Sequence, residues 1–576
     1  MYSVHPRLLL ALASVMIASI SANASGSAAP TPAQDFGTWS VLREHDGPTH
    51  RSKMGWMVTS LGDVDQDGIA DYLTTAPYAD DAFNGPFGRA YLYSGADGSL
   101  IREHEGTSYG GRLGIAAANV GDLDGDSVND YSIGIPWQDR PHGRRTGAVW
   151  TYSGATGQII WEALGQGNYW LFGREIVGTG DVDGDGTPDV LVSAPEANIG
   201  HSYNAKGMVY LLSGVDGSVL WNQKGKHDFD YLGGTLAAVG DLDGDGTPDF
   251  CASGRGGGML PKGTVHIFSG ATGQELRVLR GGDYGSEVSA FGNDICSVGD
   301  WDQDGYPDVA ISSPFERILP YLHSAGAVRI FSGHSGELLH TLYGDSMYSD
   351  FGSAICKLDD FDGDGTPDLG VGLPVNFDDG GVRVYSGRDA RLLWSYDSPI
   401  DQEEFGYSIA DAGDLNGDGR SELLVGSIED GVWIVGNGSV KVMTWDPHLI
   451  PGATVASASA GGSFTSQLHF PISEANKPFA LLLSETGTGP ARYLNQYVPL
   501  SLDPMFWASA QGNYPSLFNN PTGVLNALGE ASFSYQWSPA QLNSQIGHTY
   551  WACAVTFDPG VGLRMVSIAV PLSVIR

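Results

Sequence analysis

An acidic ten-residue pattern, Gly-Asp-x-Asp-x-Asp-Gly-x-x-Asp in its fullest form, recurs along this chain at an almost constant interval. One copy, at residues 180–189, has the sequence GDVDGDGTPD. The first aspartates are Asp63, Asp122, Asp181, Asp241, Asp300, Asp360 and Asp414, at intervals of 59, 59, 60, 59, 60 and 54 residues. A fixed period of this length is typical of repeat architectures, in which each repeat is one supersecondary unit. The chain is therefore expected to contain seven copies of one unit.

Other features keep the same phase as the acidic pattern. A glycine stands eight residues before each first aspartate, as Gly173 does, and in five repeats a proline such as Pro195 stands fourteen residues after it. Each unit holds four short alternating runs separated by turn residues, and no window has a sustained helical period. The first strand should lead into the acidic loop, the second should end at the proline, and the third and fourth should form a hairpin. Four strands in each of seven units predict an all-β fold with a seven-bladed β-propeller.

The acidic loops have the composition of cation sites. Alternate side chains of a tight loop point inward, and so many carboxylates converge favourably only around a hard divalent ion, above all Ca²⁺. We expect ligands from the side chains at loop positions one, three, five and nine and from the main-chain carbonyl at position seven. Carboxylates occupy 27 of the 28 side-chain positions. The predicted ligand residues are Asp63, Asp65, Asp67, Ile69, Asp71, Asp122, Asp124, Asp126, Val128, Asp130, Asp181, Asp183, Asp185, Thr187, Asp189, Asp241, Asp243, Asp245, Thr247, Asp249, Asp300, Asp302, Asp304, Tyr306, Asp308, Asp360, Asp362, Asp364, Thr366, Asp368, Asp414, Asn416, Asp418, Arg420 and Glu422.

Two alternatives to this interpretation are a helical calcium hand and an acidic turn that binds no metal. A helical hand needs a glutamate at position twelve, where this chain has strand residues such as Val192 and Ile311. The repeated spacing favours metal over a bare turn. Two loops should bind most weakly. Ser127 replaces a bend glycine in the second loop, and Asn416 and Glu422 replace aspartates in the seventh. Up to seven structural Ca²⁺ ions are thus predicted.

The net charge of −37 excludes nucleic acid as a partner, because few cationic groups are available to neutralise phosphates. Arg7, the apolar residues 8–20 and the A-x-A sequence at 22–24 predict a secretory signal peptide, with an uncleaved anchor as the alternative. No other stretch is long and apolar enough to span a membrane. Residues 1–24 are thus expected to be removed on export, and residues 25–38 to form a flexible leader. The mature protein should be secreted or lie at the cell surface, without an essential disulfide framework among its four cysteines.

Phe172-Gly173, the acidic loop and Ala194-Pro195 resemble the FG-GAP repeats of the integrin α-chain propeller. The resemblance covers roughly residues 39–445, and it implies Ca²⁺ between the first and second strands of a blade and a ligand-binding opposite face. The fourth repeat departs from the pattern with Gly254-Arg255, and the seventh departs with Ser427-Ile428.

Closure of the ring and the C-terminal region leave questions open. The segments WSVLREH (39–45) and VKVMTW (440–445) both suit the outer strand of the seventh blade, and the sequence does not choose between them. Residues 446–576 lose the acidic repeats and show seven or so alternating runs, which predict an antiparallel β-sandwich of unknown role.

Binding is favoured over catalysis as the function. No G-x-S-x-G nucleophile elbow is expected, and the chain has no H-E-x-x-H motif, no Walker loop and no G-x-G-x-x-G fingerprint. An extracellular protein or glycan is the expected ligand, and an extracellular hydrolase or lyase and a purely structural surface or matrix component are the alternatives. Aromatic residues that either contact the ligand or plug the blade ends are Tyr109, Tyr169, Trp170, Phe229, Tyr231, Tyr284 and Tyr348.

Overall fold

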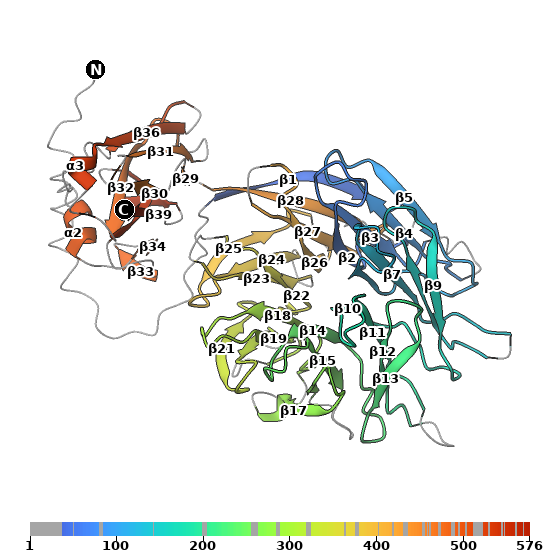
Figure 1. Ribbon diagram of the computed structural model, residues 1–576. Coiled ribbons are helices and arrows are strands. Elements are labelled where there is room, and N and C mark those ends of the chain that lie inside the picture. The colour runs from blue at the N-terminus through green and yellow to red at the C-terminus, as the bar shows by residue number, and fades with distance from the viewer. Residues whose placement is uncertain are drawn as a thin grey trace.

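The structure divides into seven four-stranded sheets and a smaller C-terminal β-region. The computed structural model (Figure 1) describes residues 37–575 except for 50, 80–84, 142, 199–203, 255–262, 284–288, 318–323, 362–364, 375–379, 401–402, 418–419, 430–435, 448, 452–454, 458, 460–461, 471–473, 485–489, 494–495, 501–503, 511–521, 528–529, 543–544, 546–547, 559–561 and 568–569. The predicted signal peptide, and all but the last two residues of the predicted leader, lie outside the described residues.

Six blades are antiparallel meanders of four consecutive strands. Their strands are β2 (Val58–Gly62), β3 (Asp71–Ala76), β4 (Arg89–Tyr93) and β5 (Leu100–Glu105); β6 (Ala117–Gly121), β7 (Asp130–Ile135), β8 (Ala148–Tyr152) and β9 (Ile159–Leu164); β10 (Ile176–Gly180), β11 (Asp189–Ala194), β12 (Met208–Leu212) and β13 (Val219–Lys224); β14 (Leu236–Gly240), β15 (Asp249–Gly254), β16 (Thr264–Phe268) and β17 (Glu275–Arg280), with the 3₁₀ turn η1 (Gly281–Asp283) after it; β18 (Ile295–Gly299), β19 (Asp308–Ser313), β20 (Ala327–Phe331) and β21 (Leu338–Tyr343); and β22 (Ala354–Leu358), β23 (Asp368–Leu373), β24 (Gly381–Tyr385) and β25 (Leu392–Asp397).

The blades form a closed ring around their first strands. Each first strand contacts the first strand of the next blade, and β26 (Phe405–Gly413) of the seventh blade contacts β2 of the first. Every second strand is buried along its whole length, whereas the fourth strands of the first six blades alternate between exposed, half-buried and buried residues. Apolar side chains fill the space between neighbouring blades, as Leu73 of the first blade and Ile133 of the second do. The seven-bladed propeller predicted from the repeat spacing is confirmed.

The seventh blade is completed by the start of the chain. Its order is β26, β27 (Glu422–Ser427), β28 (Ser439–Pro447) and β1 (Gly37–Asp46). In Figure 1 the blue β1 lies beside the orange β28, and Trp39 faces Trp445 in their antiparallel register. The two segments do not compete for one position: β28 is the third strand of the blade and β1 is the fourth, outer strand.

The C-terminal region contains a three-stranded sheet, a six-stranded sheet and a hairpin. Its elements are β29 (Leu449–Pro451), β30 (Val455–Ser457), β31 (Gly462–His469), β32 (Pro478–Ser484), β33 (Pro490–Tyr493), β34 (Gln496–Pro499), α2 (Pro504–Ala510), β35 (Thr522–Val524), β36 (Glu530–Trp537), α3 (Pro539–Leu542), β37 (Thr549–Asp558), β38 (Gly562–Val566) and β39 (Val570–Ile575). Leu468 and Tyr535 of the first sheet share one apolar cluster with Leu482 and Val555 of the second, as a sandwich requires. One pair, β30 with β39, is parallel, whereas the alternating pattern predicted only antiparallel strands.

The four cysteines are free thiols. Cys251 and Cys553 are buried, and Cys296 and Cys356 are half-buried on neighbouring first strands. In the part of the chain that the structure describes, no helix is long and apolar enough to cross a membrane.

Candidate metal centres and the opposite face of the propeller

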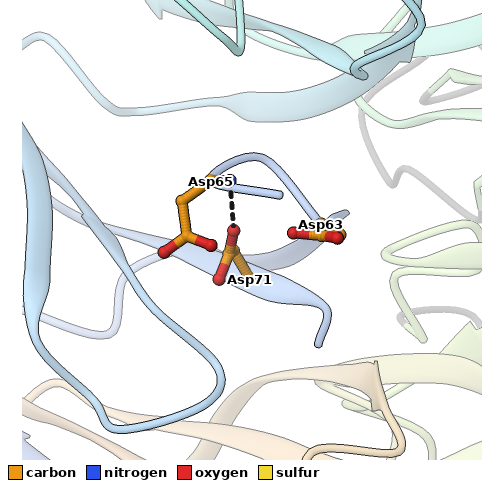
Figure 2. Close-up of side chains that lie close together, drawn as sticks. All are labelled: Asp63, Asp65 and Asp71. Carbon is orange, nitrogen blue, oxygen red and sulfur yellow. Dashed lines mark hydrogen bonds between the residues drawn. The ribbon is translucent and has the colours of Figure 1, made fainter. Parts of the chain in front are cut away.

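The acidic loops connect the first and second strands of the blades, as β10 and β11 show for the third. In five loops, three carboxylates each offer an oxygen that lies within 4.8 Å of the other two. Positions one, three and nine converge in the first four loops, and positions one, three and five converge in the fifth. The groups are Asp63, Asp65 and Asp71; Asp122, Asp124 and Asp130; Asp181, Asp183 and Asp189; Asp241, Asp243 and Asp249; and Asp300, Asp302 and Asp304. Figure 2 shows the first of them.

The remaining predicted ligands are placed less completely. The position-five residues of the first four loops, and Asp308 of the fifth, are not members of these groups. Asp362, Asp364 and Asp418 lie outside the described residues. The sixth loop is therefore described only at Asp360, Thr366 and Asp368, and the seventh only at Asp414, Asn416, Arg420 and Glu422 among the predicted ligands. The carbonyl ligand at position seven remains a prediction in every loop.

Main-chain amides hold the first carboxylate of each loop in place. In the third loop, Oδ1 of Asp181 accepts hydrogen bonds from the amides of Gly184 at 2.7 Å and Asp185 at 3.1 Å. Its Oδ2 accepts the amide of Gly186 at 2.9 Å. Asp183 accepts the Asp185 amide at 3.1 Å, and Asp185 accepts the Thr187 amide at 2.8 Å. The loop is thus curled around its carboxylates by its own backbone.

The position-nine aspartate is the buried member of the first four groups. Oδ2 of Asp189 accepts the amides of Val182 at 3.0 Å and Asp183 at 3.3 Å, and Oδ1 accepts the amide of Gly214 at 3.1 Å. Figure 2 shows the equivalent hydrogen bond from the Asp65 amide to Asp71, at 3.1 Å. Burial raises the pKa of Asp130, Asp249 and Asp308 to about 6, although these amide hydrogen bonds oppose the shift. A cation beside such a desolvated carboxylate favours its ionised form.

The loop bends require left-handed backbone, which glycine adopts at low cost. Gly186 has φ 95°, and its counterpart Ser127 in the second loop has φ 70°. A non-glycine residue in this region costs about 1–2 kcal/mol. The expected strain at Ser127 is therefore present.

The seventh loop is tied together by side chains. Nδ2 of Asn416 donates to Oε1 of Glu422 at 2.7 Å and to Oγ1 of Thr444 at 2.9 Å. Oε2 of Glu422 accepts the Leu415 amide at 2.7 Å. An amide group at position three thus bonds directly to the position-nine carboxylate.

The donor set fits a hard divalent cation. All side-chain donors in the five groups are carboxylate oxygens, which suit Ca²⁺ and not the softer metals that select nitrogen or sulfur. Position-twelve residues such as Val192 lie in the second strands, where they cannot act as ligands. The geometry is thus compatible with Ca²⁺ at the five groups.

The opposite end of the ring carries a cavity of about 900 Å³. It lies where the first strands begin, whereas the acidic loops follow the ends of those strands, and the two features therefore occupy opposite faces. Its lining includes Trp56, Arg174, Glu175, Asp294 and Tyr407. Burial raises the pKa of Glu175 and that of Asp294 to about 7.

The aromatic residues nominated from sequence are mostly exposed. Tyr109, Tyr169, Phe229 and Tyr348 have exposed fractions of 65%, 41%, 44% and 41%, so these four do not plug the blades. Trp170 and Tyr231 are half-buried, and Tyr231 lines the cavity. Tyr284 lies outside the described residues.

Sequence reasoning missed the main cavity residues. Trp56, Arg174, Asn293 and Tyr407 each directly follow the glycine that stands eight residues before the first loop aspartate of a repeat. The repeat phase alone could have identified them, because equivalent positions in a propeller face the same part of the ring.

One pentapeptide matches a hydrolase motif without its structural setting. Residues 106–110 (GTSYG) fit G-x-S-x-G, but they lie in the loop between β5 and β6, and no helix follows. A nucleophile elbow needs a sharp turn from a strand into a helix. Ser108 is therefore not in an elbow.

Comparison with known proteins places the repeats in a family. The FG-GAP repeat matches residues 172–212 and 291–331, and an FG-GAP-like repeat matches residues 360–425. The chain is 33% identical over 230 residues to integrin alpha-5 of Xenopus laevis, covering 37% of this chain and 20% of that protein. It is 30% identical over 209 residues to integrin alpha-V of Gallus gallus, covering 34% and 19%.

A second kind of relative matches a longer part of the chain. The phosphatidylinositol-glycan-specific phospholipase D of Homo sapiens is 27% identical over 399 residues, covering 59% of this chain and 46% of that protein. The chain thus spans about a fifth of the integrin relatives and less than half of this phospholipase. The chain thus contains FG-GAP repeats within its seven-bladed propeller and is similar to the integrin α-chains over about a third of its length.

Proposed function

We propose that this protein is a secreted, calcium-stabilised propeller that binds a ligand outside the cell, as an adhesion or recognition module. The observation that carries this proposal is that the two faces of the propeller hold different kinds of site. Convergent carboxylates occupy one face, and a cavity with aromatic and polar residues occupies the other. The integrin relatives and the predicted signal peptide support an extracellular role.

Calcium is proposed to act structurally. The ligands belong to the turns between first and second strands, so an ion there would fix the angle at which a blade begins. Extracellular calcium sites commonly have Kd values of about 10⁻⁴–10⁻³ M. At about 1 mM calcium, each site would then add roughly 0.4–1.4 kcal/mol to the free energy of unfolding. Several such sites together equal a large part of a domain's net stability.

The test is thermal unfolding of the protein in calcium and in chelator. We expect Tm to rise by at least about 5 °C when about 1 mM calcium replaces the chelator. Magnesium at the same concentration should have a smaller effect, because it demands octahedral geometry and dehydrates reluctantly. An identical Tm in calcium and chelator would refute the proposed sites.

A second candidate function is hydrolysis, which the phospholipase D relatives favour. The assay is product release from phosphatidylinositol-glycan and polysaccharide substrates. Turnover at a rate that tracks the protein through purification would establish the enzyme. Ligand binding without turnover would favour the recognition module.

A further inference from the structure

Seven equivalent residues, one from each blade, line the cavity at the start of the first strands. Their side chains divide the rim into two unlike halves. Blades seven, one and two contribute the large residues Tyr407, Trp56 and Ile115. Blades four, five and six contribute the small or polar residues Gly234, Asn293 and Ser353, and Arg174 of blade three stands between the two halves. At this level of the rim, the residues of blades four to six therefore leave more room than those of blades seven, one and two.

The wall formed by blades seven and one is aromatic. The ring centroids of Trp56 and Tyr407 are 5.2 Å apart, and the Trp56 ring also lies 5.5 Å from Tyr78. Trp56 and Tyr407 are half-buried and line the cavity, so their rings remain partly accessible. The planes of Trp56 and Tyr407 are inclined by 46°, so a flat apolar surface of a ligand can stack on the Trp56 ring while its edge contacts Tyr407.

The facing wall is built from polar groups in fixed positions. Thr235 donates to the carbonyl of Asn293 at 2.7 Å, and the amide group of Asn293 donates to the carbonyl of Ser353 at 3.1 Å. Together with Arg174 and Glu175, this wall presents both donors and acceptors to the cavity.

Two carboxyl groups of this wall, those of Asp294 and Glu175, already have hydrogen-bond partners. Oδ1 and Oδ2 of Asp294 accept the amides of Ile295 and Ile355, both at 2.8 Å. Oε1 of Glu175 accepts a hydrogen bond from Arg174 at 3.1 Å. Burial also keeps both carboxyl groups partly protonated near neutral pH. The cavity lining also holds Glu196, Asp350 and Glu404, so it offers several carboxyl groups that can accept hydrogen bonds from ligand hydroxyl groups.

We propose that the cavity binds a neutral saccharide, with one sugar face stacked on Trp56 beside Tyr407 and its hydroxyl groups bonded to the wall from Arg174 to Ser353. A pyranose ring combines an apolar C–H face with hydroxyl groups around its rim, which matches one aromatic and one polar wall. The volume of about 900 Å³ lies in the range of about 300–1,000 Å³ typical of small-ligand sites, so a short oligosaccharide segment is the occupant. This inference rests on the proposed function, because it names the ligand of that face.

The experiment applies the full chain, in calcium, to an array of neutral malto-, cello-, laminari- and manno-oligosaccharides, with extracellular-matrix proteins and a lysine-rich peptide beside them. Calorimetry then measures the affinity of the strongest saccharide. Trp56→Ala should weaken binding about tenfold or more through loss of stacking. Gly234→Leu should do the same by filling the cavity, and at this position a Cβ would meet only Ser253 Oγ at 3.1 Å and Tyr231 O at 3.8 Å.

Tyr343→Ala is the matched control, because Tyr343 is 52% exposed at the end of the outer strand β21 and does not line the cavity. Its affinity should stay within about twofold of the unmodified protein, and unchanged Tm values would show that all three variants fold. Saccharide affinity should also be insensitive to salt between about 0.05 and 0.5 M, unlike that of a charged ligand.

The possible results distinguish failure of the saccharide site from failure of the proposed recognition function. Saccharide binding that survives both Trp56→Ala and Gly234→Leu would overturn the saccharide site. So would a protein or peptide that binds where no saccharide does, but this result would leave the recognition function standing. Binding to nothing on the array would overturn both.

Discussion

At the scale of single residues, the position-nine aspartate differs from the other acidic residues of its loop. Asp189 is fully buried, and its two oxygens join the acidic loop to Gly214 at the start of the turn between the third and fourth strands. Asp185, in contrast, is exposed and bonds only within its own loop. The sequence assigns both residues the same role as metal ligands. The structure gives Asp189 a second role that needs no ion.

We therefore predict that Asp189→Ala and Asp185→Ala differ in the absence of calcium. In chelator, Asp189→Ala should lower Tm by roughly 2–5 °C, because three main-chain amides lose their acceptor. Asp185→Ala, the matched control, should stay close to the unmodified protein in chelator. Both should reduce the stabilisation that calcium adds. Equal Tm values for the two variants in chelator would contradict the second role of Asp189.

Glu175 in the cavity gives a prediction of pH dependence. Its pKa is raised by burial to about 7, whereas a glutamate in an unfolded chain titrates near 4.3. The folded protein thus binds this proton more tightly than the unfolded chain. The resulting stability is complete below about pH 4 and is lost as the pH rises through about 7.

Glu175→Gln should accordingly flatten the profile of Tm against pH. Between about pH 5 and 8, its Tm should fall by roughly 1–3 °C less than that of the unmodified protein. Glu162→Gln, on the exposed face of β9, is the control and should keep the original profile. A parallel decline of all three proteins would show that Glu175 does not titrate differently on folding.

At the scale of strands, neighbouring blades are joined by side chains of the outer strands. Each of these side chains donates a hydrogen bond to a carbonyl in the turn between the third and fourth strands of the next blade. Arg102, Trp161 and Arg277 are each the third residue of their strand. The pairs are Arg102 with Gly154 at 2.8 Å, Trp161 with Gly214 at 2.8 Å, Gln223 with Gly273 at 2.7 Å and Arg277 with Gly333 at 3.0 Å. Arginine, tryptophan and glutamine side chains thus make the same hydrogen bond between neighbouring blades. A search for identical residues at equivalent positions would miss this contact.

Strand β1 joins the N-terminal end of the chain to the seventh blade and contacts the sixth, and it thereby closes the ring. It pairs with β28 along its length, and the Trp39 ring stacks on Trp394 of the sixth blade with centroids 3.7 Å apart. Without β1, the outer edge of β28 and this aromatic surface would be exposed, and exposed strand edges promote association.

A chain that begins at residue 47 should therefore be destabilised and should self-associate. We expect a lower Tm and larger species in light scattering, whereas a chain that begins at residue 37 should match the full protein. A synthetic peptide of residues 37–46 should restore Tm when added in excess. A monomeric shortened chain with unchanged Tm would show that β1 is dispensable.

At the scale of the molecule, repetition determined what the sequence could predict. Seven acidic loops such as 180–189 count the blades, and alternation within each repeat supplies the strands. Closure was not decidable, because β1 and β28 are paired across nearly the whole ring and both have strand patterns. The parallel pairing of β30 with β39 likewise depends on contacts far apart in the chain.

The candidate sites were predictable to different degrees. The carboxylate groups follow from loop spacing, and the structure brings three residues together in each of five loops. The cavity depends on the relative sizes of side chains from seven separate repeats. Gly234 and Trp56 can be recognised as cavity residues only when the closed ring places them around one space. A motif within one repeat contains no information about the size of the side chains at the equivalent positions of the other repeats.

The placement of β28 between β27 and β1 also has a mechanical consequence. The chain leaves the propeller for the C-terminal sheets directly from the end of this inner strand. Tension between a ligand held on the ring and an attachment beyond residue 449 would therefore pull β28 along its own axis. Both flanking ladders would then be loaded in shear, with their hydrogen bonds sharing the force. An edge strand at this exit would be held by one ladder only, so sliding β28 out should need a larger force than sliding out an edge strand.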